Sequence, residues 1–241
     1  CGVVLLFTVP KRIIKITMFL YEYKMERGIA MDSRVESYFE DIKGKKIAFL
    51  GIGGSNLPLA KIFRQKGAIV FACDKREKEQ LGKTGEELEQ MGIALNLGEH
   101  YLEQLDVDVM FRTPGMRFHT KELEQAREKG IVVTSEMEVF FDLCPCPIYA
   151  VTGSDGKTTT TTIISEFLKA AGKRVHLGGN IGTPLLPEIE QIDKNDVAVV
   201  ELSSFQLISM RRSPKVAVVT NLSPNHLDMH KDMDEYVQAK R

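Results

Sequence analysis

Apolar and polar residues follow two alternating patterns from residue 45 onward. Short, nearly continuous apolar runs such as KKIAFLGIG and AIVFACD alternate with longer segments such as NLPLAKIFRQKG and the charged stretch 76–91, which have the pattern of amphipathic helices. Buried strands give the first pattern, and helices with one apolar face give the second. Strands separated by helices predict a parallel, doubly wound α/β sheet.

The same rhythm continues to about residue 143. The run VDVMFR predicts a strand, the turn Thr113-Pro114-Gly115 follows it, and then come a helix around 121–129, the strand IVVT and a helix that begins near Ser135. The segment LCPCP at 143–147 breaks the periodicity because its two prolines cannot continue a helix. We therefore expect a Rossmann-like, parallel-sheet domain over residues 31–146.

A second α/β unit is expected over residues 147–241. The strand IYAVT, a glycine-rich turn and a helix over 157–171 open it, and the runs RVHLG, DVAVVEL and KVAVVT predict three more strands. Helices are expected between them, one toward Gln191 and one through Met210. The last segment turns helical near Asp232, and the sequence stops inside that helix, so we expect this domain to be incomplete.

Residues 1–30 form an apolar tract that one proline and several cations interrupt. The tract is too broken to span a bilayer, and it lacks the order of charge, apolar core and cleavage site that marks a signal peptide. Met31 is a better start residue. We interpret residues 1–30 as an extension that is non-native or disordered, with a surface-lying amphipathic segment as the alternative.

Composition excludes several classes of protein. Hydrophobic residues make up 43% of the 241 positions and charged residues 27%, the balance of a folded globular protein, and the net charge is −1. That charge gives no general attraction for nucleic acid or an anionic membrane, so small-molecule partners are expected. The four cysteines, with Cys144-Pro-Cys146 lacking a second pair, indicate reduced thiols in a cytoplasmic compartment and favour a proline-rich linker over a metal site.

The strongest chemical signal lies between the strand IYAVT and the helix after it. The segment Val151-Thr-Gly-Ser-Asp-Gly-Lys-Thr158 places glycines, a lysine and a threonine as a P-loop does, although Val151 stands where the first glycine belongs. Glycines turn N–H groups toward phosphate oxygens, the lysine reaches the β- and γ-phosphates, and the threonine can ligate Mg²⁺. A glycine-rich turn with a chance lysine is the alternative. The predicted phosphate-binding residues are Gly153, Ser154, Asp155, Gly156, Lys157, Thr158 and Thr159.

Two other strand ends carry candidate ligand-binding residues. The loop Gly51-Ile-Gly53-Gly54-Ser-Asn56 resembles a dinucleotide fingerprint whose third glycine is Asn56, and Asp74 ends the next strand. A tight turn without a ligand, followed by a solvated strand end, is the alternative. Glu201 ends the strand DVAVVE, where a second Mg²⁺ ligand is found opposite a P-loop. The alternative is a helix start capped by Ser203 or Ser204.

The segments TGSDGKTTT, GGNIGTP, ELSSFQL, NLSPNHLD and EYVQAK together resemble, in order and spacing, the motifs of the Mur ligases. The resemblance covers about residues 45–241. It implies ATP-dependent amide formation, in which a substrate carboxylate attacks the γ-phosphate of ATP and an amino acid then displaces phosphate from the acyl phosphate. With GIGGSN, DKR and TPG, the pattern is most similar to the member that adds D-glutamate to UDP-N-acetylmuramoyl-L-alanine in peptidoglycan precursor synthesis.

The resemblance also implies roles for individual residues. One Mg²⁺ would be held by Thr158 and Glu201 and a second by His226 and a carbamylated Lys240. The implied catalytic residues are Lys157, Asn180, His226 and Lys240. The UDP-sugar would be bound by Gly53, Gly54, Ser55, Asp74, Lys75, Arg76, Thr113, Pro114 and Gly115. The D-glutamate site would lie in a C-terminal domain outside this sequence, so we expect the chain alone not to complete the ligation.

Other functions stay open. A different Mur-type ligase or a folylpolyglutamate-type ligase would share the P-loop. An NAD(P)-dependent dehydrogenase would use the first glycine-rich loop, but it leaves the P-loop and ELSSFQL unexplained. A non-catalytic UDP-sugar-binding protein would need only the first domain.

Overall fold

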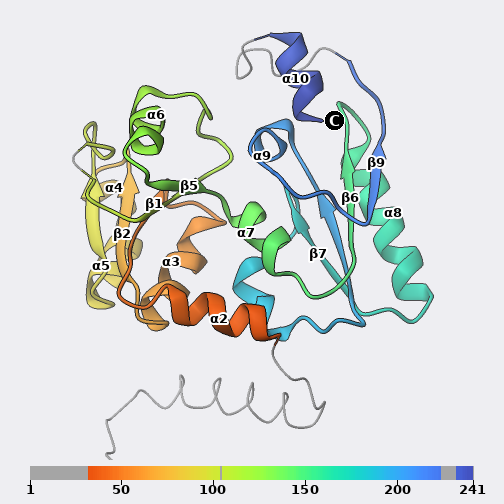
Figure 1. The fold of residues 1–241 in the computed structure, drawn as a ribbon, viewed down its shortest axis with the longest axis horizontal. Coiled ribbons are helices and arrows are strands. Elements are labelled where there is room, and N and C mark those ends of the chain that lie inside the picture. The colour runs from red at the N-terminus through yellow and green to blue at the C-terminus, as the bar shows by residue number, and fades with distance from the viewer. Residues whose placement is uncertain (1–31, 104, 224–231, 241) are drawn as a thin grey trace, which may run out of the picture.

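The computed structural model describes residues 32–103, 105–223 and 232–240. These residues form two parallel β-sheets with helices packed against them, one sheet before and one after the segment 143–147 (Figure 1). The expected α/β class with parallel sheets is therefore confirmed. The predictions made for residues 1–30 and for His226 lie outside the described residues.

The first sheet has the strand order β3-β2-β1-β4-β5. Its strands are β1 (Lys46–Leu50), β2 (Ile69–Asp74), β3 (Ala94–Leu97), β4 (Val109–Arg112) and β5 (Val132–Thr134). Its helices are α2 (Ser33–Asp41), α3 (Asn56–Gln65), α4 (Lys78–Leu81), α5 (Lys83–Gln90), α6 (Lys121–Glu128) and α7 (Glu136–Leu143). The chain order reverses at β1, which lies between β2 and β4. In an open α/β sheet, ligands bind outside the carboxyl ends of the strands at such a switch point.

The second sheet has the strand order β7-β8-β6-β9. Its strands are β6 (Ile148–Thr152), β7 (Val175–Gly179), β8 (Val197–Glu201) and β9 (Val216–Val219). Its helices are α8 (Lys157–Ala170), the 3₁₀ helix η1 (Leu186–Gln191), α9 (Ser204–Leu207) and α10 (Met233–Ala239). Because all pairs are parallel, the carboxyl ends of β6, β7 and β8 meet at one edge of the sheet. The P-loop segment leaves the sheet at this edge.

Some elements differ from the sequence prediction. Strand β3 was not predicted, because its residues are exposed or half-buried and do not form an apolar run. The charged stretch 76–91 forms two helices instead of one, since Gly82 takes a φ of 52° between them. The helix expected toward Gln191 is the 3₁₀ helix η1, and the helix expected through Met210 ends at Leu207.

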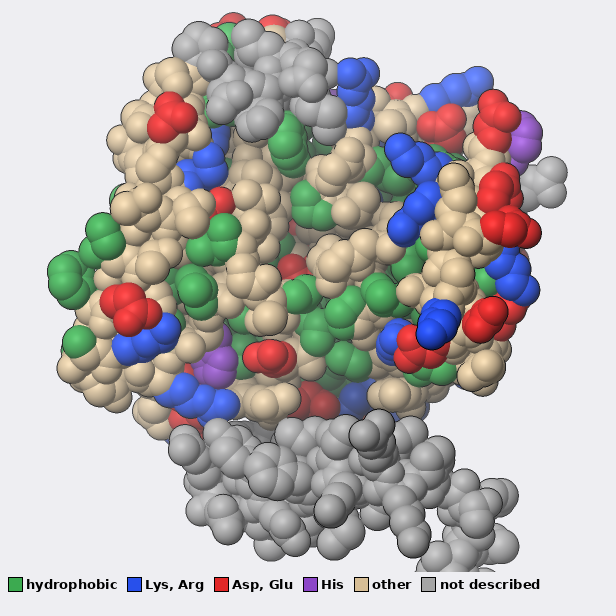
Figure 2. Space-filling model, turned by 180° about the vertical axis from the view of Figure 1, so that it is seen from behind, with side chains coloured by type: hydrophobic (Ala, Val, Ile, Leu, Met, Phe, Trp, Pro, Cys, Tyr) green, Lys and Arg blue, Asp and Glu red, His purple; other side chains and the backbone are tan. Residues whose placement is uncertain are grey.

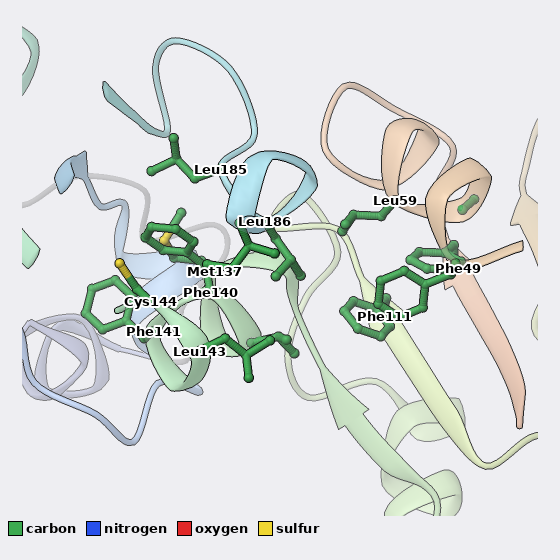
Figure 3. Close-up of a cluster of buried hydrophobic side chains, with 14 of the residues drawn as sticks. Phe49, Leu59, Phe111, Met137, Phe140, Phe141, Leu143, Cys144, Leu185 and Leu186 are labelled. Atoms are coloured by element: carbon green, nitrogen blue, oxygen red, sulfur yellow. The ribbon is translucent and has the colours of Figure 1, made fainter. Parts of the chain in front are cut away.

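One apolar core joins the two sheets (Figure 3). Phe49 and Phe111 of the first sheet stack with their ring centroids 4.9 Å apart, and Phe63 of α3 packs edge-on against both. The same cluster continues through the buried residues of α7 to Leu185 and Leu186 at the start of η1. Helix α7 is therefore the apolar link between the sheets.

Polar contacts cross the same interface. The buried Glu136 carboxylate accepts the backbone N–H groups of Leu185 and Leu186, both at 2.9 Å. The buried Arg112 guanidinium donates to Phe205 O and Ser209 Oγ, both at 2.8 Å. Side chains of β4 and α7 thus supply hydrogen-bond partners to the segments around η1 and α9, and these bonds help to hold the two units together.

Replacing Glu136 by alanine is expected to lower the free energy of unfolding by about 2–4 kcal/mol, because two buried N–H groups lose their acceptor. Glu136→Gln keeps an acceptor oxygen and removes the charge. Burial raises the pKa of Glu136, so the stability that this carboxyl contributes is lost as the pH rises through its folded-state pKa. In denaturant unfolding, the free energy of unfolding of Glu136→Gln should therefore rise relative to that of the parent chain between about pH 4 and pH 8. If the free energies of unfolding of Glu136→Gln and the parent differed by the same amount at both pH values, this account of the interface would be wrong.

Charged side chains of both signs lie side by side on the face that Figure 2 shows. Several charged side chains of the protein form ion pairs, as Lys66 does with Glu190 at 2.7 Å. Among the described residues, no helix has both the length and the apolar character that crossing a membrane requires.

Candidate functional site

The predicted P-loop connects β6 to α8 at the carboxyl edge of the second sheet. Gly153 has a φ of 145°, and a Cβ at this position would lie 1.9 Å from Thr220 Oγ1. Gly156 has a φ of 75° and precedes α8, whose N-terminus receives no side-chain cap. Both positions favour glycine, and the start of α8 offers N–H groups and a partial positive charge to an anion.

The loop after β9 holds the P-loop in place. Ser154 N–H donates to Asn221 O at 3.0 Å, and Asp155 N–H donates to Asn221 Oδ1 at 2.9 Å. Ser154 Oγ lies 2.8 Å from Ser223 O and 2.8 Å from the Tyr236 hydroxyl. Sequence reasoning did not assign a role to these partners. Their position in the motifs NLSPNHLD and EYVQAK is the sequence feature that could have indicated them.

Lys157 lies in the first turn of α8 and folds over the loop that precedes it. Its ammonium donates to Gly153 O at 3.1 Å and to Ser154 O at 2.9 Å. The side chain is only partly buried. A cation therefore lies directly at the loop that is predicted to surround phosphate.

Glu201, at the end of β8, is the centre of a polar cluster. Its Oε2 accepts the hydroxyl of Thr158 at 2.7 Å, and its Oε1 accepts the amide of Asn180 at 2.9 Å. Glu201 is buried, whereas Thr158 and Asn180 are exposed. The helix-cap alternative is also realised, because Ser203 caps α9 by accepting Gln206 N–H. Capping by Ser203 leaves the Glu201 carboxylate directed at Thr158.

Lys240, at the end of α10, is brought to the start of the same loop. Its buried ammonium donates to Thr152 Oγ1 at 3.1 Å and to Gly153 O at 3.0 Å. Burial and, to a smaller extent, the charge of Lys157 lower the pKa of Lys240 to about 8. The structure therefore brings four predicted residues together at the carboxyl edge of the second sheet: Lys157, Thr158, Glu201 and Lys240.

The Lys240 amine is expected to react with an amine-specific acylating reagent with a midpoint near pH 8, in magnesium-free buffer. In the same chain unfolded in urea, the midpoint should rise to about 10.4. Lys157→Met should shift the native midpoint upward because it removes the neighbouring positive charge. The measurement is peptide-resolved mass spectrometry across a pH series. Equal midpoints in the native and unfolded chain would contradict the buried position of this amine.

The loop after β1 differs from a dinucleotide fingerprint in a way that the structure explains. Asn56, at the third-glycine position, is fully buried, and its amide donates to Leu50 O and Gly51 O at 3.1 Å and to Phe111 O at 3.2 Å. It ties the ends of β1 and β4 together. Gly53 and Gly54 are exposed, and a Cβ at either position would meet nothing within 4 Å.

Asp74 and Arg76 pair with each other at the end of β2. The buried Asp74 carboxylate accepts Ile52 N–H at 2.7 Å, and it binds the Arg76 guanidinium at 2.9 Å. Although burial acts to raise it, hydrogen bonds from Arg76 and from Ile52 N–H lower the pKa of Asp74 to about 2. The alternative of a solvated strand end therefore does not hold for this carboxylate, whereas Lys75 is exposed.

The two carboxyl edges face a common cavity of about 240 Å³. The first sheet contributes Gly54, Ser55 and Pro114, and the second contributes Gly179, Asn180 and Gln206, with Glu136 of α7 also in the lining. Of the TPG turn, Thr113 packs against Gly51 and Gly115 is exposed. Asn180 both contacts Glu201 and lines the cavity, so it connects the P-loop cluster to the loops of the first sheet.

Comparison with known proteins finds a family model and several relatives that this chain resembles. Residues 151–241 match the Mur ligase middle domain. Over 212 residues, the chain is 54% identical to a UDP-N-acetylmuramoylalanine--D-glutamate ligase of Acetivibrio thermocellus and 51% identical to one of Clostridium botulinum. In both comparisons the chain is similar to Mur ligases. The matches cover 88% of this chain and 46% of each relative, so the chain spans about half the length of the curated relatives it matches.

A solved structure supports the fold of this chain. It is that of a UDP-N-acetylmuramate:L-alanyl-gamma-D-glutamyl-meso-diaminopimelate ligase from Neisseria meningitides, with a TM-score of 0.50 and 22% sequence identity. The match covers 81% of this chain and 66% of that chain. At this identity the likeness supports the arrangement of the elements alone.

Proposed function

We propose that the chain is the UDP-sugar-binding and ATP-binding part of a cytoplasmic ligase that adds D-glutamate to UDP-N-acetylmuramoyl-L-alanine. The observation that carries this proposal is the cavity that the loops after β1 and β4 share with Asn180 and Gln206. It offers a path from a nucleotide-sugar on the first sheet to a phosphate on the P-loop. The 54% identity to a D-glutamate ligase supports the choice of reaction.

In this proposal the two sheets belong to two domains, residues 31–146 and 147–241. The first would bind the UDP-sugar at the exposed loop of Gly53 and Gly54 and at the TPG turn, where a backbone without bulky side chains lets a diphosphate approach closely. The second would bind ATP. D-Glutamate would be bound by residues beyond those of this sequence.

Lys157 and the start of α8 would stabilise the charge that builds up when the substrate carboxylate attacks the γ-phosphate. Lys157 now donates to two neutral carbonyl oxygens of its own loop. Turning the ammonium to phosphate oxygens would exchange neutral acceptors for charged ones, which form stronger hydrogen bonds. The lysine needs no general acid or base for this role, because phosphoryl transfer depends mainly on positioning and charge.

Thr158 and Glu201 fit a Mg²⁺ ion. They supply a hydroxyl and a carboxylate oxygen 2.7 Å apart, and oxygen donors are the ligands that this cation prefers. When bound, Mg²⁺ would neutralise charge on the phosphate oxygens. Asn180 holds the second oxygen of Glu201 and so keeps the carboxylate oriented.

Lys240 fits the carbamylated lysine of the proposed mechanism. Carbamylation requires a neutral amine, and a pKa of about 8 leaves part of the Lys240 population neutral near physiological pH. The adduct would replace a cation beside Lys157 by an anionic oxygen donor. Assignment of His226 as its partner rests on the sequence motif.

The proposal is tested by calorimetric titration of the chain with UDP-N-acetylmuramoyl-L-alanine, and separately with NAD⁺. We expect the muramoyl nucleotide to bind and NAD⁺ not to bind. Gly53→Glu should weaken binding by about tenfold or more, because it adds bulk and negative charge at an exposed loop without a steric clash in the free protein. Gln90→Glu on α5 adds the same charge at another exposed position and should leave binding unchanged.

Other outcomes identify the alternatives. Binding of NAD⁺ alone would favour a dehydrogenase and overturn the proposal. Stronger binding of a folate or of a longer muramoyl peptide would point to another ligase of the same superfamily. Binding of the muramoyl nucleotide without any binding of ATP would favour a UDP-sugar-binding protein.

A further inference from the structure

Cys144 and Cys146 lie in the short connection between the sheets and take no part in the proposed function. Both are buried free thiols, and their Sγ atoms are 3.5 Å apart. Cys144 belongs to the apolar cluster around α7 that links the sheets (Figure 3). The sequence predicted a linker with reduced thiols. The structure adds that the two thiols touch each other.

Local backbone geometry brings the thiols together. Cys144 caps the end of α7 directly after Leu143, and it has φ −57° and ψ 121°, the extended conformation that a following proline favours. In an extended chain, residues two apart direct their side chains to the same side. The intervening proline limits the backbone freedom of the pair. The close contact is therefore built into Cys-Pro-Cys at this position.

The two sulfur atoms are chemically unequal. Hydrogen bonding with the Cys146 side chain lowers the pKa of Cys144, against the opposing effect of burial, and the nearby Arg34 acts in the same direction as the hydrogen bond. The same hydrogen bond and burial raise the pKa of Cys146. Thiolate is the form that attacks disulfides, so Cys144 is the better nucleophile of the pair.

We propose that Cys144 and Cys146 form a redox-active dithiol that reacts with low-molecular-weight disulfides and closes to an intrachain disulfide. The Cys144 thiolate attacks one sulfur of the external disulfide, forming a mixed disulfide and releasing one thiolate. Cys146 loses its proton to solvent and attacks Cys144 Sγ, releasing the second thiolate. The protein loses two hydrogen atoms, and the external disulfide is reduced to two thiols.

Two observations favour this chemistry over metal binding and over inert packing. Among the described residues, no group of three or more His, Cys, Asp or Glu side chains is arranged to hold a metal ion. The two Sγ atoms are already in contact at 3.5 Å and must approach to about 2.05 Å for the bond to form. Cys73 is the internal contrast, because it is fully buried and burial raises its pKa to about 12.

The experiment is to incubate the native chain with glutathione disulfide, block free thiols with iodoacetamide and digest for mass spectrometry. The peptide that contains both cysteines should resist alkylation and be lighter by about 2 Da than its reduced form, and dithiothreitol should reverse the change. Cys73 should react at least about tenfold more slowly than the pair. These results do not depend on ATP or on the muramoyl nucleotide.

Two variants assign the order of attack. Cys146→Ser should accumulate a mixed disulfide of glutathione on Cys144, whereas Cys144→Ser should reduce modification of Cys146 by about tenfold or more. Circular dichroism should verify that both variants fold. The proposal is overturned if both thiols of the native parent chain remain fully alkylatable after glutathione disulfide. It is equally overturned if the intrachain disulfide forms only in urea.

Discussion

Replacing Lys157 by methionine is expected to weaken the binding of ATP about 100-fold, the equivalent of about 2.7 kcal/mol. Within the described part of the chain, the ammonium donates to the neutral acceptors Gly153 O and Ser154 O, so the parent loses little when the ammonium turns to the phosphates. A hydrogen bond between a cation and a phosphate oxygen is roughly twice as strong as a neutral one. Methionine keeps most of the apolar length of lysine and removes this charge. Isothermal titration with ATP and Mg²⁺ measures the effect.

Lys169→Met is the matched control for this measurement. Lys169 lies in the last turn of the same helix and pairs with Glu166 at 2.8 Å on an exposed face. Such an exposed pair contributes little to stability, and the lysine lies at the helix end away from the loop. The control should bind ATP like the parent. If both variants lost affinity equally, or if Lys157→Met lost none, the phosphate role of Lys157 would be wrong.

Replacing Gly179 by alanine is expected to destabilise the chain by about 3–5 kcal/mol, among the largest effects of a single methyl group. Gly179 pairs with Glu201 across β7 and β8, and it has a φ of 93°. An added Cβ would lie 2.1 Å from the backbone oxygen of Glu201. Because backbone and not a flexible side chain is in the way, the strand pair itself must open, and Glu201 would move away from Thr158.

Gly172→Ala separates the clash from the backbone strain. Gly172 has a φ of 78°, but a Cβ there would meet nothing within 4 Å. This variant should cost only about 1 kcal/mol, the usual penalty for alanine in the left-handed region. Urea unfolding of both variants gives the comparison. If Gly179→Ala and Gly172→Ala lost equal stability, β7 would be able to move aside for the methyl group, and the Gly179–Glu201 contact would not be rigid.

Local sequence chemistry determined most of the secondary structure and the position of the P-loop. A buried strand is visible in the sequence as an apolar run. The start of a helix after a glycine and beside a lysine is likewise visible from neighbouring residues alone. For that reason β6 and the start of α8 lie where the sequence predicts them. Elements without such a pattern were missed, as the exposed edge strand β3 was, or were predicted in the wrong form, as η1 was.

The tertiary structure alone decided which distant residues meet. Asn56 stands at a glycine position of a familiar loop pattern, yet it ties β1 to β4, because Phe111 O lies within its reach only in the folded sheet. Lys240 reaches Thr152 across 88 positions of the sequence. Its lowered pKa follows from burial beside Lys157, which no local pattern contains. The sequence by itself determined the strands, the helices and the chemistry carried by each loop, because these depend on neighbours along the chain. The cavity, the cluster around Glu201 and the paired thiols were decided by packing, because they depend on atoms that only folding brings together.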